Sequence, residues 1–377
     1  MSEKLLQSSM VSDDVERDYF STNPPPTALD RYKTVAENFI NFHASSGNRL
    51  VLITSGGTTV PLEKQTVRFI DNFSAGTRGA TSAEYFLEAG YAVIFLHRQF
   101  SLLPYSRHYS HATHCFLDFL HEGPDGKVIA NEEYREEMLT VLRKYHAAKE
   151  KKMLLTIPFV SVTDYLFTLR LVSQLMRPLA SSGLLYLAAA VSDFFIPPER
   201  MSEHKIQSTG ATDVRPVLNA NASKTTEKEV FDNFDSSPSV PRSKRLIIDL
   251  DPVPKFLKRL VDEWASECMI VSFKLETDKE ILIQKAQYSL ECYQHNLVIG
   301  NLLATRKSEV VFVAAGQEHR WIRTGSGSVN RETLDGKENN HRPQSENESE
   351  IEKLIIPAVV ELHQTHIERY KFSHFKS

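Results

Sequence analysis

Short runs of consecutive apolar residues recur along the chain, and each run ends in small or polar residues. Five have this form: RLVLITSGG (49–57), AVIFLHR (92–98), LLYLAAAVSD (184–193), MIVSFKLET (269–277) and NLVIGN (296–301). Branched apolar residues without alternation are typical of strands buried on both faces of a parallel sheet. A further run, EVVFVAA (309–315), indicates an edge strand.

Segments with helical spacing separate these predicted strands. In residues 79–91, Ala80, Ala83, Phe86 and Leu87 fall on one face and Gly90 occupies the position after the last helical turn. Residues 278–295 form a second amphipathic pattern, and residues 27–46 a third that Thr27 would cap. Alternation of strands and helices predicts one α/β domain over residues 1–377: a doubly wound, mostly parallel Rossmann-like sheet with helices on both faces.

Two long polar segments interrupt this pattern. Residues 209–245 and 316–350 are rich in Ser, Asn and Gly and show no sustained apolar period. We expect them to be flexible insertions in the single domain. A regulatory segment, or one that docks other enzymes, is the alternative.

Ligands of such sheets bind beyond the carboxyl ends of the strands. The small and polar residues of this chain gather at those ends: Ser55 to Gly57, Ala189 to Asp193, Phe273 with Lys274, and Asn301. The pattern therefore predicts a binding site along this edge of the sheet.

The connection after the first strand is rich in glycine. If Ser74 caps the following helix, Gly76 and Gly79 lie in its first turn, where bare backbone N–H groups attract an anion. Gly56 and Gly57 would let a nucleotide lie close to the backbone. A tight turn before a well-packed helix is the alternative.

The segment is neither G-x-x-x-x-G-K-[ST] nor G-x-G-x-x-G. The second strand also ends in His97-Arg98 rather than in an acidic residue, which disfavours a nicotinamide-dependent reductase.

Polar side chains near the predicted strand ends suit a reaction between anions. Arg68 offers bidentate contacts to a phosphate or carboxylate, and the Asn72 amide could stabilise an oxyanion; an Arg68–Asp71 salt bridge is the alternative. Asp193 follows a strand, and Lys205 lies beyond a proline-containing loop that could cover a triphosphate. A plain surface lysine is the alternative there.

The segment HYSHATHC holds His108, His111, His114 and Cys115. Histidines three residues apart share a helix face and could hold a metal, but no H-E-x-x-H context accompanies them. We therefore expect solvated or core-edge histidines and no protein-bound metal.

The composition of the chain bears on its expected partners and on its location in the cell. The 377 residues are 41% hydrophobic and 24% charged with a formal net charge of −4, so nucleic acid is not the expected partner. The three cysteines have no C-x-x-C spacing, which is typical of a reducing compartment. The start of the chain lacks the apolar core of a secretory signal, and the longest apolar run, residues 184–191, is too short to span a membrane. We expect a cytoplasmic protein.

Taken together, several segments resemble the phosphopantothenate–cysteine ligase family in its stand-alone eukaryotic form. They are SGGTTVPLEKQTVRFIDNFSAGTRGA, AAAVSDF, EHKIQS, SFKLETD and GNLLATR, in this order, between about residues 30 and 310. The combination of D-N-F-S-x-G-x-R-G with A-A-A-V-S-D is specific. The resemblance implies an ATP-dependent carbon–nitrogen ligase of coenzyme A biosynthesis that joins 4′-phosphopantothenate to L-cysteine. The nucleoside triphosphate, ATP or CTP with Mg²⁺, activates the pantothenate carboxylate as an acyl-nucleotidylate, and the family forms homodimers.

The resemblance also assigns residues. It implies that the nucleotide is bound by Gly56, Ser74, Gly76, Gly79, Phe273 and Asn301. It implies that the substrate is held by Arg68, Asn72, Ala189, Ala190 and Asp193. Asn72 would also stabilise the activated acyl group, and Lys205 would neutralise the phosphates from a mobile flap; these two are the expected catalytic residues.

Two departures accompany the resemblance. The flap reads His204-Lys205-Ile206-Gln207 where bacterial members have a K-x-K-K pattern, and the 209–245 insertion follows it directly. The insertions leave a second hypothesis open, a nucleotide-binding scaffold subunit without catalysis.

Overall fold

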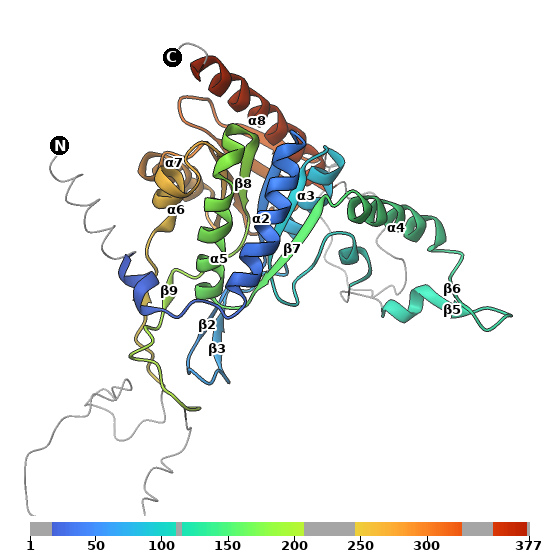
Figure 1. Ribbon diagram of the computed structural model, residues 1–377, viewed down its shortest axis with the longest axis horizontal. Coiled ribbons are helices and arrows are strands. Elements are labelled where there is room, and N and C mark those ends of the chain that lie inside the picture. The colour runs from blue at the N-terminus through green and yellow to red at the C-terminus, as the bar shows by residue number, and fades with distance from the viewer. Residues whose placement is uncertain (1–16, 111–114, 207–245, 326–349, 375–377) are drawn as a thin grey trace, which may run out of the picture.

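A central sheet of eight strands organises the computed structural model, which describes residues 17–110, 115–206, 246–325 and 350–374 (Figure 1). Six strands are parallel: β1 (Leu50–Ser55), β4 (Ala92–Arg98), β7 (Leu154–Phe159), β8 (Gly183–Leu187), β11 (Met269–Glu276) and β12 (Leu297–Leu302). Two antiparallel strands follow at one edge, β13 (Glu309–Val313) and β14 (Arg320–Arg323). The sheet is mostly parallel, as the apolar runs predict.

The strand order places β1 between β8 and β4, third from the β7 edge of the sheet. The spatial order is β14-β13-β12-β11-β8-β1-β4-β7. The chain thus builds outward from β1 through β4 to β7, then returns to the other side of β1 and builds outward from β8. This is the doubly wound topology, and the direction of winding reverses between β1 and β8.

Alternate residues of the strands feed two hydrophobic cores, one on each face. Helices α2 (Leu29–Ser45) and α5 (Val162–Leu175) cover one face, where Leu50 and Leu52 point. Helices α3 (Thr77–Glu88) and α8 (Glu352–His374) cover the other, where Val51 and Ile53 point. Helix α7 (Lys279–Tyr293) covers the end of the sheet near β12 and β13. Every residue of β1 is buried, as expected for a strand between two helical layers.

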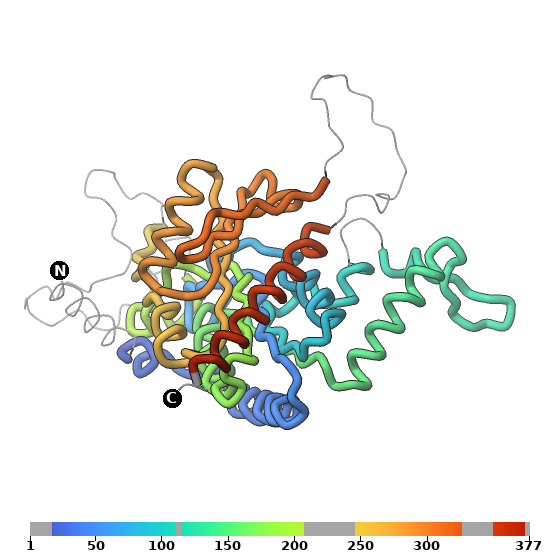
Figure 2. Tube along the Cα trace, turned by 90° about the horizontal axis from the view of Figure 1, so that it is seen from above, coloured from blue at the N-terminus to red at the C-terminus, as the bar shows by residue number. Residues whose placement is uncertain are grey.

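Smaller elements surround this frame. The hairpin of β2 (Thr59–Pro61) and β3 (Phe69–Asp71), and the antiparallel pair of β9 (Phe194–Phe195) and β10 (Asp251–Pro252), lie beyond the carboxyl ends of β1 and β8 (Figure 1). Helix α4 (Arg135–Glu150) and the hairpin of β5 (Leu120–Glu122) and β6 (Val128–Ala130) extend past β7 (Figure 2). A short helix, α6 (Phe256–Arg259), continues into a π-helical turn, Leu260–Trp264.

The structure differs from the sequence pattern in three places. Strand β13 is not the edge strand, because β14, which lies inside the expected 316–350 insertion, pairs with it. Thr27 does not cap α2; the helix begins after Ala28 without a side-chain cap. Strand β7 and helices α4 and α5 were not predicted.

The two expected insertions lie mostly outside the described residues: all of residues 209–245, and residues 326–349 of the second insertion. Among the described helices, none is long and apolar enough to cross a membrane.

Candidate functional site

Backbone hydrogen bonds join the segments that follow β1 and β8, at the point where the winding reverses. Ala190 N–H donates to the Gly56 carbonyl (2.8 Å), and Thr58 N–H donates to the Ala190 carbonyl (3.0 Å). The Thr54 hydroxyl accepts from Ala189 N–H (3.2 Å). Two of the predicted site segments, 56–57 and 189–190, therefore form one continuous floor beyond the sheet.

Asn72 is held above this floor by its backbone. Its N–H donates to the Thr58 carbonyl (3.1 Å). A methyl group at Gly57 would lie 1.6 Å from the Asn72 carbonyl oxygen, so only glycine permits this approach. The glycine after β1 thereby fixes the position of the predicted catalytic asparagine.

Helix α3 begins beside the same floor, but its cap differs from the prediction. The N-cap is Gly76, in the left-handed region at φ +83°, and no side chain caps the helix. Ser74 lies two residues earlier, where its hydroxyl accepts from Gly76 N–H at 3.4 Å. The first-turn N–H groups have no partner within the helix, as at any helix start. Sequence reasoning missed that glycine takes the cap because the backbone conformation there requires positive φ.

The glycines of this site lie so close to neighbouring segments of the chain that a side chain would clash with them. A methyl group at Gly56 would lie 2.5 Å from Arg98 Cβ, and one at Gly79 would lie 2.4 Å from Ser55 Oγ. A methyl group at Gly76 would lie 2.9 Å from the same Ser55 hydroxyl, which donates to the Gly76 carbonyl (3.0 Å). These glycines allow α3 and the turn after β4 to pack against the end of β1. The nucleotide contacts expected of them stay a prediction.

Phe273 and Asn301 lie on the neighbouring strands β11 and β12. Asn301 is next to the last residue of β12, but Phe273 lies inside β11, which continues to Glu276 rather than ending at Phe273 as expected. The Phe273 ring packs edge-on against Tyr186 with 5.1 Å between centroids, and Asn301 is buried. The guanidinium of Arg78, in the first turn of α3, lies 6.0 Å from the Phe273 ring centroid. This arginine connects the helix start to the β11 side of the site.

Two further contacts fix Arg78. Its Nη1 donates to Glu352 Oε1 of α8 at 2.6 Å, and its other terminal nitrogen donates to the Arg306 carbonyl. Arg78 belongs to the D-N-F-S-x-G-x-R-G segment, so the motif could have drawn attention to it, but spacing alone gave it no role.

Arg68 lies in the loop between β2 and β3, and its partner differs from the expected one. Its Nη1 donates to Glu63 Oε1 (3.2 Å) and to the Ile206 carbonyl (2.7 Å). Asp71, the expected partner, instead pairs with Arg98 at 2.7 Å. Glu63 is fully buried, and sequence reasoning missed it because a lone glutamate in a polar loop carries no pattern.

The other two predicted polar residues lie at the surface of this region. Asp193 is exposed directly after Ser192, and its carbonyl accepts from Val253 N–H (2.8 Å). Lys205 is exposed in the segment that runs beside the β2–β3 loop. The structure thus joins the backbones of Gly56 and Ala190, places Asn72 against Gly57 and Thr58, and leaves the Asp193 and Lys205 side chains solvent-exposed.

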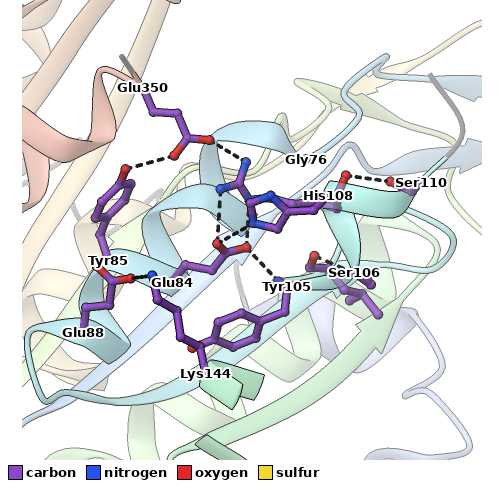
Figure 3. A network of polar contacts seen from close by, with 12 residues as sticks. Gly76, Glu84, Tyr85, Glu88, Tyr105, Ser106, His108, Ser110, Lys144 and Glu350 are labelled. Carbon is purple, nitrogen blue, oxygen red and sulfur yellow. Dashed lines mark hydrogen bonds and ion pairs between the residues drawn. The ribbon is translucent and has the colours of Figure 1, made fainter. Parts of the chain in front are cut away.

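A buried ion-pair network holds the far side of α3 (Figure 3). The Glu84 carboxylate accepts from Arg107 Nε (2.7 Å), His108 Nε2 (3.0 Å) and Tyr105 N–H (2.7 Å). Arg107 also pairs with Glu350 at 2.6 Å. Burial alone would raise the pKa of Glu84, but hydrogen bonds from His108 and Arg107 outweigh it and lower the pKa to about 2.

This network accounts for one of the histidines considered for metal binding. His108 contacts Glu84, whereas His111 and His114 lie outside the described residues. Within the described part of the chain, no group of three or more His, Cys, Asp or Glu residues could hold a metal ion.

A cavity of about 650 Å³ lies elsewhere, between α4 and the segment that contains Tyr105 and Tyr109. Its lining is mainly apolar, with Leu139, Leu142 and Tyr145 contributed by α4. None of the predicted site residues lines it. Because the polar strand ends and the helix start converge on the β1–β8 junction, we take that junction as the candidate site.

Comparisons with known proteins agree on one family. No family model matches the chain. It is 46% identical over 353 residues to phosphopantothenate–cysteine ligase CAB2 of Saccharomyces cerevisiae, covering 92% of this chain and 86% of that protein. It is 39% identical over 312 residues to the phosphopantothenate–cysteine ligase of Homo sapiens, covering 81% and 89%. The solved structure of a Cab2 mutant in complex with phosphopantothenate-cysteine matches with a TM-score of 0.75 and 44% identity, over 94% of this chain and 99% of that one.

Proposed function

The chain belongs to the phosphopantothenate–cysteine ligase family, and from that premise we propose that it joins 4′-phosphopantothenate to L-cysteine using ATP. The similarity covers most of both chains, including every segment that carries a predicted site residue. We also propose that it acts in the cytoplasm as a homodimer.

The proposed reaction has two steps. A carboxylate oxygen of phosphopantothenate attacks the α-phosphorus of ATP, which forms an acyl-adenylate and releases pyrophosphate. The cysteine amine then attacks the acyl carbon, loses a proton and releases AMP as the amide bond forms. Activation is needed because a carboxylate has no good leaving group until one of its oxygens is bonded to phosphorus in a mixed anhydride.

The start of α3 supports a nucleotide role for the glycine-rich connection. Gly76 leaves the helix without a side-chain cap, so its first N–H groups and the helix dipole are available to phosphate oxygens. In this proposal Gly56, Ser74, Gly76 and Gly79 shape the phosphate side of the site. Phe273 and Asn301 contact the rest of the nucleotide.

We assign the binding of the acyl substrate to the floor of residues 56–57 and 189–190 and to the β2–β3 hairpin. Ala189 and Ala190 would hold phosphopantothenate by their backbone, with Arg68 and Asp193 at the rim. Asn72 would donate its side-chain amide to the oxygen on which negative charge develops when the acyl carbon becomes tetrahedral. Lys205 would neutralise the phosphates during the first step.

Mg²⁺ would enter the site with the nucleotide. Magnesium is usually held by substrate phosphates with one or two carboxylates, so the nucleotide itself would supply most of its ligands. When bound, the ion would withdraw charge from the triphosphate.

The observation that carries the proposal is the contact of Asn72 with the β1–β8 junction. The motif asparagine lies over Gly57, next to the Ala190 segment. The acyl group and the α-phosphate must meet at one point for the first step.

Cysteine-dependent pyrophosphate release from 4′-phosphopantothenate and Mg²⁺ nucleotide tests the proposal, with ATP compared against CTP. We expect turnover with ATP and a loss of about 100-fold or more in kcat for Asn72→Ala, because one oxyanion donor is removed. Lys205→Ala should lower kcat by a similar factor. Lys127→Ala, an exposed lysine in the β5–β6 turn, is the matched control and should behave as wild type.

Each alternative outcome has a defined meaning. A wild type that binds nucleotide but releases no pyrophosphate would contradict the ligase and favour the scaffold hypothesis. Turnover with CTP alone would show that CTP, and not ATP, is the nucleotide substrate. Asn72→Ala with unchanged kcat would remove that residue from the chemistry.

A further inference from the structure

The side chain of Glu63 joins two segments that the proposed mechanism uses separately. It lies in the β2–β3 loop and is fully buried. Its Oε2 accepts from the backbone N–H groups of Val67 (3.2 Å) and Arg68 (2.9 Å). Its Oε1 accepts from Arg68 Nη1 (3.2 Å) and from Ile206 N–H (3.3 Å).

Arg68 closes the same connection from the other direction. The Nη1 that contacts Glu63 also donates to the Ile206 carbonyl at 2.7 Å. Both polar backbone groups of Ile206 are therefore bound by this pair. Because Ile206 directly follows Lys205, the pair fixes the chain on one side of the flap lysine.

The chain on the other side of Lys205 is also attached to the loop. Lys64 N–H donates to the Ser202 carbonyl (2.9 Å), and Lys64 Nζ pairs with Glu203 at 3.1 Å. Segment 202–206 is thus attached to the β2–β3 loop on both sides of Lys205. The Lys64–Glu203 pair is exposed and the Glu63 carboxylate is not, so the two links differ in strength.

We propose that Glu63 is a positioning residue of the ligase reaction: its buried carboxylate holds Arg68 and the Lys205 segment in one arrangement. The inference rests on the proposed function, which assigns Arg68 to the substrate and Lys205 to the phosphates. A single carboxylate then sets the separation between the group that holds the acyl substrate and the group that neutralises the triphosphate. Aligning those two anions is what the first step requires.

Glu63→Gln tests the proposal, because it keeps the length of the side chain and removes its charge and one acceptor. We expect the KM for 4′-phosphopantothenate to rise and kcat to fall, with kcat/KM lower by about 10- to 100-fold. The KM for cysteine should stay unchanged. Glu203→Gln breaks the exposed link between the same two segments and should change each constant by less than about twofold.

A double variant separates positioning from a purely structural role. If Glu63 acts by placing Lys205, Glu63→Gln should reduce kcat much less in a Lys205→Ala background than in wild type. Equal reduction in both backgrounds, or a loss of activity that the loss of folded protein fully explains, would overturn the proposal. So would kinetics equal to those of Glu203→Gln.

Amide hydrogen exchange gives a readout that needs no activity. Glu63→Gln should speed exchange at Arg68 and Ile206 by at least about tenfold, and Glu203→Gln should not. Unchanged exchange would overturn the link itself. If the wild type has no ligase activity while exchange responds as expected, the proposed function fails and the link between loop and flap segment stands without its catalytic role.

Discussion

Two buried carboxylates, Glu63 and Glu84, each hold a loop in place by hydrogen bonds. Glu63 binds the β2–β3 loop and segment 202–206, and Glu84 binds the turn that contains Tyr105 and His108. In Glu63, as in Glu84, burial would raise the pKa, but backbone and Arg68 hydrogen bonds lower it below its ordinary value. Both groups are therefore charged at neutral pH and keep their donors in place.

Stability should depend on pH through Glu84. A folded pKa of about 2 lies below the ordinary 4.5, so ionised Glu84 stabilises the fold above about pH 4.5, and this contribution is lost as pH falls toward 2. At pH 7, Glu84→Gln should lower the free energy of unfolding by about 3 kcal/mol. Urea unfolding of wild type and variant between pH 7 and pH 3 measures the difference. A difference that does not shrink with acid would contradict the assigned role.

At the residue scale, the motif resemblance named residues that lie near one another, but it did not explain what holds them. The backbones of Gly56 and Ala190 are hydrogen-bonded, and Asn72 lies against the neighbouring Gly57 and Thr58. The resemblance could not identify the partner of Arg68, because Glu63 and Asp71 lie at comparable distances along the sequence and only the turn of the loop decides between them. Glu84 also escaped notice, since a glutamate on a helix is usually exposed.

Helix α3 packs closely against β1 because glycine, which has no side chain, lies at the contact. Gly79 faces Ser55 so closely that an added methyl group would overlap its side chain. At the other end of the helix, Gly90 has positive φ and open space around its Cβ position. One glycine therefore serves packing and the other serves backbone conformation.

Gly79→Ala should destabilise the protein by about 1–3 kcal/mol although alanine favours helices, because the core between α3 and β1 is overpacked. The displaced helix start should also weaken nucleotide binding. Thermal unfolding and a nucleotide titration measure both effects. Gly90→Ala is the control: it should cost about 1 kcal/mol through strain alone and leave nucleotide affinity unchanged.

At the element scale, burial decided what the sequence could predict. Strands β1 and β4 are buried on both faces, and each begins and ends at or near the ends of the apolar run that predicted it. Strand β7 lies at an edge and contains Pro158, so its pattern is weak. Among the residues of α4, only Ala148 is buried, so that helix has no clear apolar face.

The whole molecule carries an exposed apolar patch beside the candidate site. Val67, Phe69, Ile70 and Phe73 lie on the β2–β3 hairpin and just after it, and Phe194 lies on β9; the exposed fraction of Phe73 is 93%. Exposed apolar side chains that gather on neighbouring elements are typical of protein interfaces. We therefore take these residues as the candidate interface of the proposed homodimer.

Phe69→Glu combined with Ile70→Glu should shift the protein from dimer to monomer, because two charges would be buried in the interface. Ligase activity should fall with the dimer fraction. Sedimentation velocity at several concentrations, with activity measured on the same samples, checks both. Phe42→Glu, an exposed aromatic on α2, is the control and should remain dimeric. A wild type that sediments as a monomer would refute the homodimer.

The packing of α3 between β1 and α8 sets an order of events during synthesis. The motif between residues 55 and 79 leaves the ribosome early, and β4 and β7 can pair with β1 soon afterwards. However, β8 follows β1 by more than a hundred residues, and Glu352 of α8, which holds Arg78, follows far later. A nascent chain thus carries the complete glycine-rich motif long before it has a site, and exposes the uncovered face of α3 to chaperones until α8 has been made.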